Sequence, residues 1–280
     1  REPGPPPRPH RPESAGRTPS RGRTRRSRLT PAGRLPRFRA ASPVPRLSKR
    51  QWIVLRRYAQ LVLTWGDRLN LTRARTLEDA ARVLVLDALP LLPHLPADGS
   101  IVDLGSGAGT PAIPLAVARP ESRFLLVEAS RKKAGFLDVV CRELMLANVD
   151  VLHARAEDLG RMPVYRERYD ASTARAVADL SVLAEYALPL LKVGGVALFP
   201  KGSRARLEAA RAGPALSLLG GAATVYELTP PPGSQIVVVR KMMPTPASYP
   251  RRPGVPARRP LSAKDLPATS RPAGPPRVSG

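Results

Sequence analysis

Residues 102–111 read Val-Asp-Leu-Gly-Ser-Gly-Ala-Gly-Thr-Pro and form the most informative stretch of the chain. An apolar run at 100–104 leads into three alternating glycines, and Pro111 then suits the first turn of a helix. Glycine lets the backbone turn sharply and lets a ligand lie against it. The stretch therefore predicts a strand, a ligand-binding turn and a helix, in that order.

Strand-like apolar runs alternate with helical stretches after this turn. The predicted strands lie near 100–104, 123–127, 149–153, 169–174 and 195–199, with helices near 111–119, 131–146, 179–191 and 203–219. Such alternation is typical of βα units and a parallel sheet. Two more runs, 222–228 and 234–241, flank a Pro-Pro-Pro-Gly stretch at 230–233 that favours a reversal and an antiparallel pair. We therefore predict an α/β domain at 98–242, with a Rossmann-like, mostly parallel seven-stranded sheet and an antiparallel last strand.

A small helical part is expected before the sheet, at 48–97. Ser48 and Gln51 have the spacing of a capping box ahead of an apolar-periodic run, which predicts a first helix. Thr76 is expected to cap a second helix, which two prolines end, Pro90 and Pro93.

The formal charge of +24 is concentrated at the two ends of the chain. Residues 1–50 hold fifteen Lys and Arg against two acids, and 240–280 hold nine against one, whereas 51–239 hold twenty-two against nineteen. Proline is frequent at both ends and excludes long helices there. We expect a disordered Arg/Pro-rich extension at 1–47 and a basic, Pro-rich, solvated tail at 243–280. Flexible basic arms commonly bind phosphate backbones, although a compositional bias explains the extension equally well.

The sequence gives no support for metal, disulfide or membrane functions. Cys141 is the single cysteine, and the histidines, His10, His94 and His153, are too scattered for metal-ligand spacing. No apolar run approaches the ~20 residues of a membrane span. We therefore expect a soluble, cytoplasmic monomer without a metal.

The spacing of the glycines favours one class of cofactor. Gly105, Gly107 and Gly109 form GxGxG, whereas the dinucleotide fingerprint GxGxxG would place a glycine where Thr110 stands. Enzymes that use S-adenosylmethionine favour the first form. Glu128 follows at the end of the second predicted strand, where an acid can accept the hydroxyl protons of a ribose, as it would in a NAD enzyme.

The end of the third predicted strand offers a second possible contact. Ala156, Glu157 and Asp158 lie just past its end, where a side chain or a backbone group could bracket an adenine. A solvated helix start explains Glu157 and Asp158 equally well.

The remaining residues restrict the chemistry. Pyrimidine C5 methylation needs a thiolate, but Cys141 lies in a predicted helix among apolar neighbours, which favours a structural role. Methylation of exocyclic amines commonly uses an Asn/Asp-Pro-Pro-aromatic turn, whereas 173–177 read Thr-Ala-Arg-Ala-Val. Guanine N7 has a free lone pair and no proton, so its methylation needs positioning rather than a general base. Arg175 is the candidate catalytic residue, because it could fix a cofactor carboxylate or hold a guanine edge; a surface ion pair is the alternative.

Seven blocks, in family order, resemble the bacterial 16S ribosomal RNA guanine-N7 methyltransferases, the glucose-inhibited-division-protein-B family. They lie at 65–72, 102–114, 126–133, 154–157, 173–177, 190–202 and 245–254. The resemblance covers roughly three quarters of the chain, from about Ser48 to Leu261. It implies methylation of a guanine in the 530-loop, in the decoding centre of the small ribosomal subunit.

The resemblance also implies a pocket and a set of RNA contacts. The expected S-adenosylmethionine residues are Gly105, Gly107, Gly109, Thr110, Glu128, Ala129, Ser130, Ala156, Glu157 and Arg175. The expected contacts with 16S rRNA are Asn70, Lys201, Tyr249, Arg251 and Arg252, with turn capping by Asn70 and solvated charge as the alternatives. Three positions depart from the family, because Leu84 and Gln235 replace frequent histidines and Ala112 replaces a common glycine.

Two other functions stay open at this point. The near-neutral centre of the chain permits methylation of a small molecule or of another RNA. The departures at Leu84 and Ala112 permit a protein with the same fold that binds ribosomal RNA without catalysis.

Overall fold

Seven strands form one sheet in the computed structural model, which describes residues 46–175, 177–228 and 234–266. The strand order is β3-β2-β1-β4-β5-β7-β6. The strands are β1 Ser100–Leu104, β2 Arg123–Glu128, β3 Val149–His153, β4 Tyr169–Thr173, β5 Leu191–Lys201, β6 Gly221–Leu228 and β7 Ser234–Lys241. β1 to β5 pair in parallel, and β7 is antiparallel to both of its neighbours. The predicted sheet is therefore confirmed, while the expected reversal at 230–233 lies outside the described residues.

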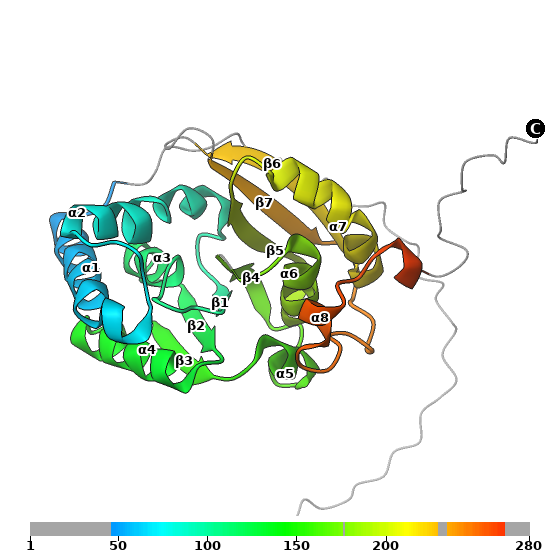
Figure 1. Ribbon diagram of the computed structural model, residues 1–280, viewed down its shortest axis with the longest axis horizontal. Coiled ribbons are helices and arrows are strands. Elements are labelled where there is room, and N and C mark those ends of the chain that lie inside the picture. Colours follow the sequence, from blue (N-terminus) through cyan, green and yellow to red (C-terminus); the bar gives the residue numbers. More distant parts are fainter. Residues whose placement is uncertain (1–45, 176, 229–233, 267–280) are drawn as a thin grey trace, which may run out of the picture. The chain divides into compact units, whose positions relative to one another are not determined.

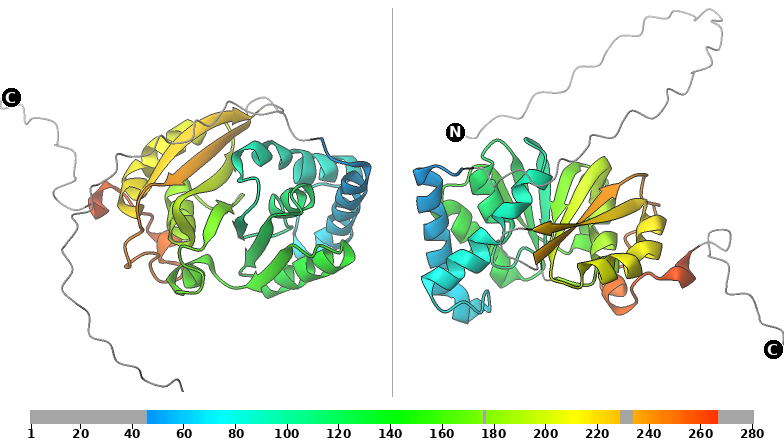
Figure 2. Two further views of the ribbon diagram at one scale, coloured as in Figure 1. Left: turned by 180° about the vertical axis from the view of Figure 1, so that it is seen from behind. Right: turned by 90° about the horizontal axis from the view of Figure 1, so that it is seen from above.

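Helices cover both faces of this sheet (Figures 1 and 2). One face carries α1 Lys49–Leu69, α2 Leu77–Ala80, α3 Ala112–Ala118 and α4 Arg131–Glu143. The other carries α5 Ala156–Arg161, α6 Leu180–Ala187 and α7 Ala205–Leu219, with α8 Val255–Arg258 beside α6. Short 3-10 helices occur at Leu89–His94, Leu188–Leu190 and Ala263–Asp265, and a π-helix at Ala81–Leu86.

The sheet separates two hydrophobic cores. Consecutive side chains of a strand point to opposite faces, so Ile101 belongs to the core under α1 to α4 and Val102 to the core under α5 to α7. Burial on both faces explains why the strands read as short, continuous apolar runs.

The N-terminal helical part follows the predicted caps but not the predicted end. Ser48 and Gln51 form the capping box of α1, and the Thr76 side chain accepts a hydrogen bond from the N–H of Asp79 at the start of α2. After four residues α2 widens into the π-helix, and the 3-10 helix Leu89–His94 contains both prolines that were expected to end it. Tertiary packing thus keeps this segment helical, since five of those six residues are buried.

The prediction of a solvated tail is wrong for residues 243–266. This segment turns back onto the domain, where Thr245, Pro250, Pro256, Leu261 and Leu266 are buried. The rest of the tail, 267–280, and residues 1–45 of the extension lie outside the described residues.

Three smaller expectations concern metal, membrane and thiol chemistry. Among the described residues, no helix combines the length and apolarity needed to cross a membrane. In the same part of the chain, His, Cys, Asp and Glu do not gather in groups of three that could hold a metal ion. Cys141 is a free, half-buried residue of α4, and burial raises its pKa to about 12, which fits a structural role.

Candidate functional site

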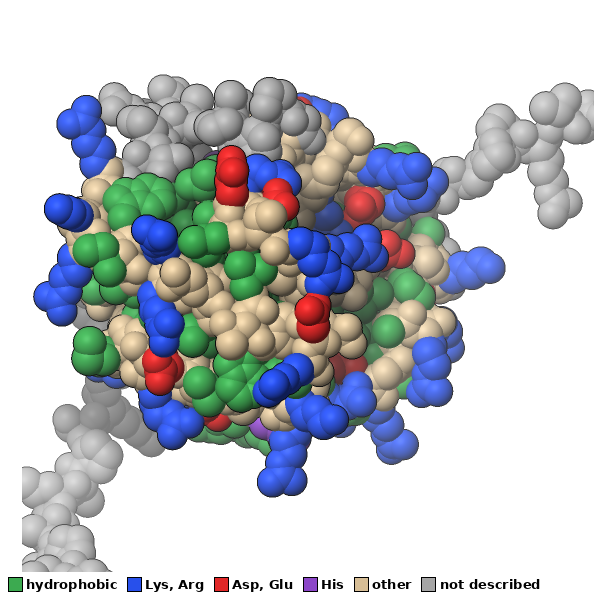
Figure 3. Space-filling view, turned by 60° about the vertical axis from the view of Figure 1, so that its left-hand side comes forward, with side chains coloured by type: hydrophobic (Ala, Val, Ile, Leu, Met, Phe, Trp, Pro, Cys, Tyr) green, Lys and Arg blue, Asp and Glu red, His purple; other side chains and the backbone are tan. Residues whose placement is uncertain are grey.

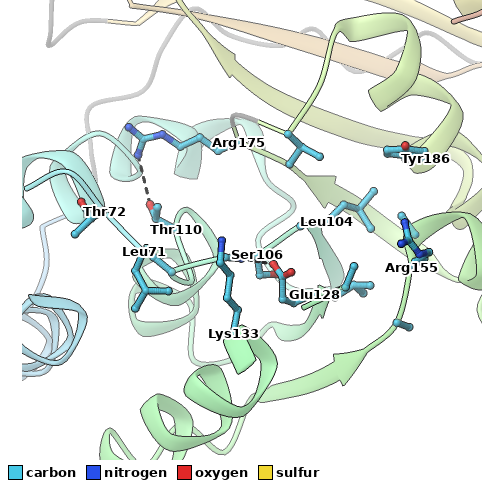
Figure 4. Close-up of a pocket in the computed structure, with 18 of the residues that line it drawn as sticks. Leu71, Thr72, Leu104, Ser106, Thr110, Glu128, Lys133, Arg155, Arg175 and Tyr186 are labelled. Carbon is cyan, nitrogen blue, oxygen red and sulfur yellow. Dashed lines mark hydrogen bonds between the residues drawn. The ribbon is translucent and has the colours of Figure 1, made fainter. Parts of the chain in front are cut away.

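The carboxyl ends of β1, β2, β3 and β4 meet around a cavity of about 560 Å³ (Figure 4). That volume lies within the range of small-molecule pockets, roughly 300–1,000 Å³. The lining residues come from the ends of these strands and the turns after them, from α4, α5 and α6, and from the N-terminal helical part; they are Leu71, Thr72, Val83, Leu84, Leu104, Gly105, Ser106, Gly107, Ala108, Thr110, Val127, Glu128, Ala129, Lys133, Ala154, Arg155, Ala156, Glu157, Arg175, Val177 and Tyr186.

The glycine turn forms the floor of the cavity, and its three glycines have different roles. Gly105 and Gly107 line the cavity at positive φ, 67° and 54°, a conformation that side chains disfavour. A Cβ on Gly105 would also lie 2.8 Å from Val177 Cγ2. Gly109 is not among the lining residues; it is buried, and its Cβ would lie 2.7 Å from Ile113. Gly109 therefore allows close packing rather than close approach of a ligand.

Glu128 is buried at the end of β2 and is held by two backbone N–H groups. Gly107 N–H donates to Oε2 and Ser130 N–H donates to Oε1, each at 2.8 Å. Ala129 lines the cavity beside it, whereas Ser130 is outside the lining and contributes through this backbone contact. The carboxylate is thus fixed against the glycine turn.

Glu157 is buried in the first turn of α5, so the solvated helix start weighed for it does not hold. Its Oε1 accepts the N–H of Gly254 at 2.9 Å. Burial, followed by the negative charge of Glu157, raises the pKa of Tyr186 to about 12. Ala156, Glu157 and Tyr186 all line the cavity.

Arg175 lies across the cavity from Arg155 and binds the N-terminal helical part (Figure 4). Its Nη1 donates to Val83 O at 2.5 Å and to Thr110 Oγ1 at 3.5 Å, and its Nη2 pairs with Asp87 at 3.2 Å. Thr110 Oγ1 in turn donates to Leu84 O at 2.8 Å. The predicted catalytic arginine therefore lines the cavity as an anchor for the π-helix.

Asp103 is fully buried beneath the floor. Thr173 Oγ1 donates to its Oδ1 at 2.5 Å. Burial raises the pKa of Asp103 to about 6. Hydrogen bonds from Thr173 and Ser106 lower this pKa by less than burial raises it, and the negative charge of Glu128 raises it further. Asp103 was not among the predicted site residues, although it lies within residues 102–111.

The five residues expected to contact RNA differ in their exposure to solvent and in their ion pairs. Asn70 is exposed and caps α1 at φ 51°, and Arg252 is exposed. Lys201 pairs with Glu208 at 2.7 Å and donates to Ala178 O, with its side chain 14% exposed. Tyr249 is partly buried in the core under α5 to α7. Arg251 pairs with the buried Glu185, so it does not present its guanidinium to solvent as expected.

Other lining residues were missed because no local pattern marks them. Leu71 and Thr72 reach the cavity from the segment after α1, and Val83 reaches it from the π-helix, as Tyr186 does from α6. Lys133 and Arg155 follow β2 and β3, the position that could have identified them.

The three departures have ordinary structural surroundings. Leu84 is buried and lines the cavity, and Ala112 is buried at the start of α3. Gln235 is buried in β7, where its Nε2 donates to Glu227 at 2.6 Å.

On the face of the molecule drawn in Figure 3, Lys and Arg side chains outnumber Asp and Glu side chains.

Comparison with known proteins gives one family. Residues 51–229 match the GidB family model, rRNA small subunit methyltransferase G. Two proteins named ribosomal RNA small subunit methyltransferase G, from Chloroflexus aggregans and Roseiflexus sp., are 46% and 47% identical over 77% of this chain and over 92% and 94% of their own sequences. The sheet order and the glycine turn after β1 are those of the Rossmann-like class I S-adenosylmethionine-dependent methyltransferase fold. The chain therefore belongs to the GidB family of rRNA small subunit methyltransferases.

Proposed function

We propose that this chain transfers a methyl group from S-adenosylmethionine to N7 of a guanine in the 530-loop of 16S rRNA. One observation carries the proposal: in a chain of this family, the ends of β1 to β4 enclose a cavity in which Glu128 is held by two backbone N–H groups. The proposal implies a cytoplasmic enzyme that acts as a monomer on 16S rRNA or the small ribosomal subunit.

The residues of the cavity suit this cofactor. Glu128 keeps acceptor capacity for ribose hydroxyls, because each carboxylate oxygen has more than one lone-pair site. Ala156, Glu157 and Tyr186 form a part-polar wall that suits an adenine, and Gly105 and Gly107 allow close approach to the backbone. S-adenosylmethionine would supply an electrophilic methyl group on its sulfonium.

The lining residues also suit N7 as the accepting atom. Guanine N7 carries a lone pair and no proton, so the protein needs to orient the base and exclude water. Among the described lining residues there is neither histidine nor cysteine, and both glutamates accept backbone N–H groups. These residues bind and orient rather than remove a proton.

Arg175 is the proposed catalytic residue. A guanidinium has five N–H donors, and three contacts hold it to Val83, Thr110 and Asp87. The other donors would fix the cofactor carboxylate or the guanine edge. Asn70 and Arg252 stay proposed RNA contacts, whereas Lys201 would first have to leave Glu208.

The test is methylation of small subunits and of 16S rRNA from cells that lack the modification. Purified protein and labelled S-adenosylmethionine should label the RNA, and borohydride reduction with aniline cleavage should map one N7-methylguanine. Transcripts that carry 7-deazaguanine, in which N7 is replaced by carbon, should not be labelled, while transcripts with ordinary guanine serve as the control. Labelled RNA without a cleavage site would contradict N7, and binding without transfer would contradict catalysis.

A further inference from the structure

Residues 245–254, here called the C-terminal strap, lie against the outside of α5, the helix that contributes Ala156 and Glu157 to the cavity. We propose that the strap is a positioning element of the cofactor pocket, in which Arg251 acts through Glu185 and Gly254 to hold Glu157 in the cavity wall. The inference rests on the proposed function, because it concerns how that cavity binds S-adenosylmethionine.

The anchor of the strap is the ion pair between Arg251 and Glu185. Backbone N–H and Nε of Arg251 donate to Glu185 Oε1 at 2.8 and 2.9 Å, and Nη2 donates to Oε2 at 2.6 Å. The Glu185 side chain is fully buried and that of Arg251 is 14% exposed. A buried carboxylate needs such a partner, because an unpaired buried charge is strongly destabilising. Arg251 is therefore committed to the interior of the protein.

The anchor is connected to the cavity by two short steps. Gly254, three residues after Arg251, donates its N–H to Glu157 Oε1 at 2.9 Å. Tyr186, the neighbour of Glu185 on α6, lines the cavity together with Glu157. Two consecutive residues of α6 thus serve the strap and the cavity wall.

Further contacts clamp the strap onto α5. Arg166 Nη1 donates to Gly160 O at 2.8 Å and to Tyr249 O at 2.7 Å, which joins the helix to the strap. Arg161 donates to Pro250 O at 3.2 Å. A Cβ on Gly160 would lie 2.8 Å from Pro250 Cγ, so the two segments are in direct contact.

Arg251 and its neighbour Arg252 make a matched pair for the experiment, because one is internal and the other is exposed. Calorimetry with S-adenosylmethionine and S-adenosylhomocysteine should give about tenfold weaker binding for Arg251→Ala, which corresponds to about 1.4 kcal/mol, the scale of one positioned hydrogen bond. Arg252→Ala should keep wild-type cofactor affinity. Arg251→Lys should recover part of the loss, since it keeps the charge but not the fork.

A general loss of stability is separated from positioning by two further measurements. With RNA as substrate, Arg251→Ala should raise KM for S-adenosylmethionine and leave kcat and RNA affinity near wild type. Hydrogen exchange of the ligand-free variant should be faster in α5 but unchanged in α3. Gly160→Ala places a methyl group against Pro250 of the strap without removing a charge, so it should also weaken cofactor binding. This variant tests the role of the strap if Arg251→Ala does not fold.

Other outcomes would overturn the inference. Wild-type cofactor affinity in folded Arg251→Ala and Gly160→Ala would do so, and so would a loss of RNA affinity alone. If the wild-type protein binds the cofactor but does not methylate 16S rRNA, the proposed function fails while the binding comparison still decides the role of the strap. If the wild-type protein does not bind the cofactor, both the proposed function and the proposed role of the strap are wrong.

Discussion

Two walls of the cavity are held in different ways. The N-terminal wall consists of Leu71, Thr72, Val83 and Leu84. Hydrogen bonds from Thr110 and Arg175 hold this wall, together with the Arg175–Asp87 ion pair, in which both side chains are 24% exposed. The α5 wall consists of Ala154, Arg155, Ala156 and Glu157. The strap and the buried Arg251–Glu185 pair hold this wall from outside the cavity.

The difference lies in where the holding residues are. Thr110 and Arg175 themselves line the cavity, so a ligand can compete with the wall for their donors. Arg251 and Glu185 are outside the lining, so a ligand does not disturb them. We therefore expect the N-terminal wall to respond to ligands and the α5 wall to stay fixed.

Truncation after Lys241 should have the largest effect, because it removes the strap and leaves Glu185 buried without its arginine. The free energy of unfolding should fall by about 3–5 kcal/mol, measured by urea denaturation. The control is truncation after Leu266, which should stay within about 0.5 kcal/mol of the full chain. It should still weaken RNA binding and make its salt dependence shallower, since Arg271 and Arg277 are lost. Equal stability of the two truncated proteins would contradict the fixed α5 wall.

Asp103, in the floor between the walls, predicts a pH effect on stability. Its pKa in the folded protein is about 6, above the ordinary 3.8, so the folded state holds the proton more tightly. Stability should therefore fall as pH rises from about 4 to about 6, by about 3 kcal/mol for this group. Asp103→Asn should lack this loss, so its unfolding free energy relative to wild type should be higher at about pH 8 than at about pH 4. A pH-independent difference between the two proteins would refute the raised pKa.

Arg175→Ala tests whether the N-terminal wall and the reaction share one residue. Turnover should fall ten- to a hundredfold, which corresponds to about 1.4–2.7 kcal/mol. Arg175→Lys should restore little, because lysine lacks the planar fork. Asp87→Asn is the control for wall anchoring, since it weakens the ion pair but keeps the arginine. Unchanged turnover in Arg175→Ala would remove the catalytic assignment.

Thr110→Val should have the smallest effect. It removes the hydrogen bond to Leu84 O, worth about 1 kcal/mol, without changing the shape of the residue much. Hydrogen exchange should become faster in the π-helix at Ala81–Leu86 and stay unchanged in α5. Faster exchange in both regions would show that the two walls do not behave independently.

Local sequence patterns were sufficient for the sheet, the caps and the floor of the cavity. Alternating apolar runs predicted the strands. Spacing alone identified Ser48 and Thr76, because each caps its helix through a residue three positions on, and Gly105, because its positive φ is a property of the local backbone. Glu128 could be predicted for the same reason, since strand ends in a parallel sheet converge at one edge. These features depend on backbone geometry that a short stretch already determines.

Only the tertiary structure decided which charged residues are available. Arg251 and Lys201 resemble solvent-facing cations in the sequence, but Glu185 is 66 residues from Arg251, and the acid beside Lys201 approaches only when α7 packs on the sheet. The partners of Arg175 are similarly remote, 88 and 92 residues away. Whether a charged side chain is paired or free depends on which distant side chain folding brings within about 3 Å of it. The periodicity of apolar residues in the sequence contains no information about such pairs.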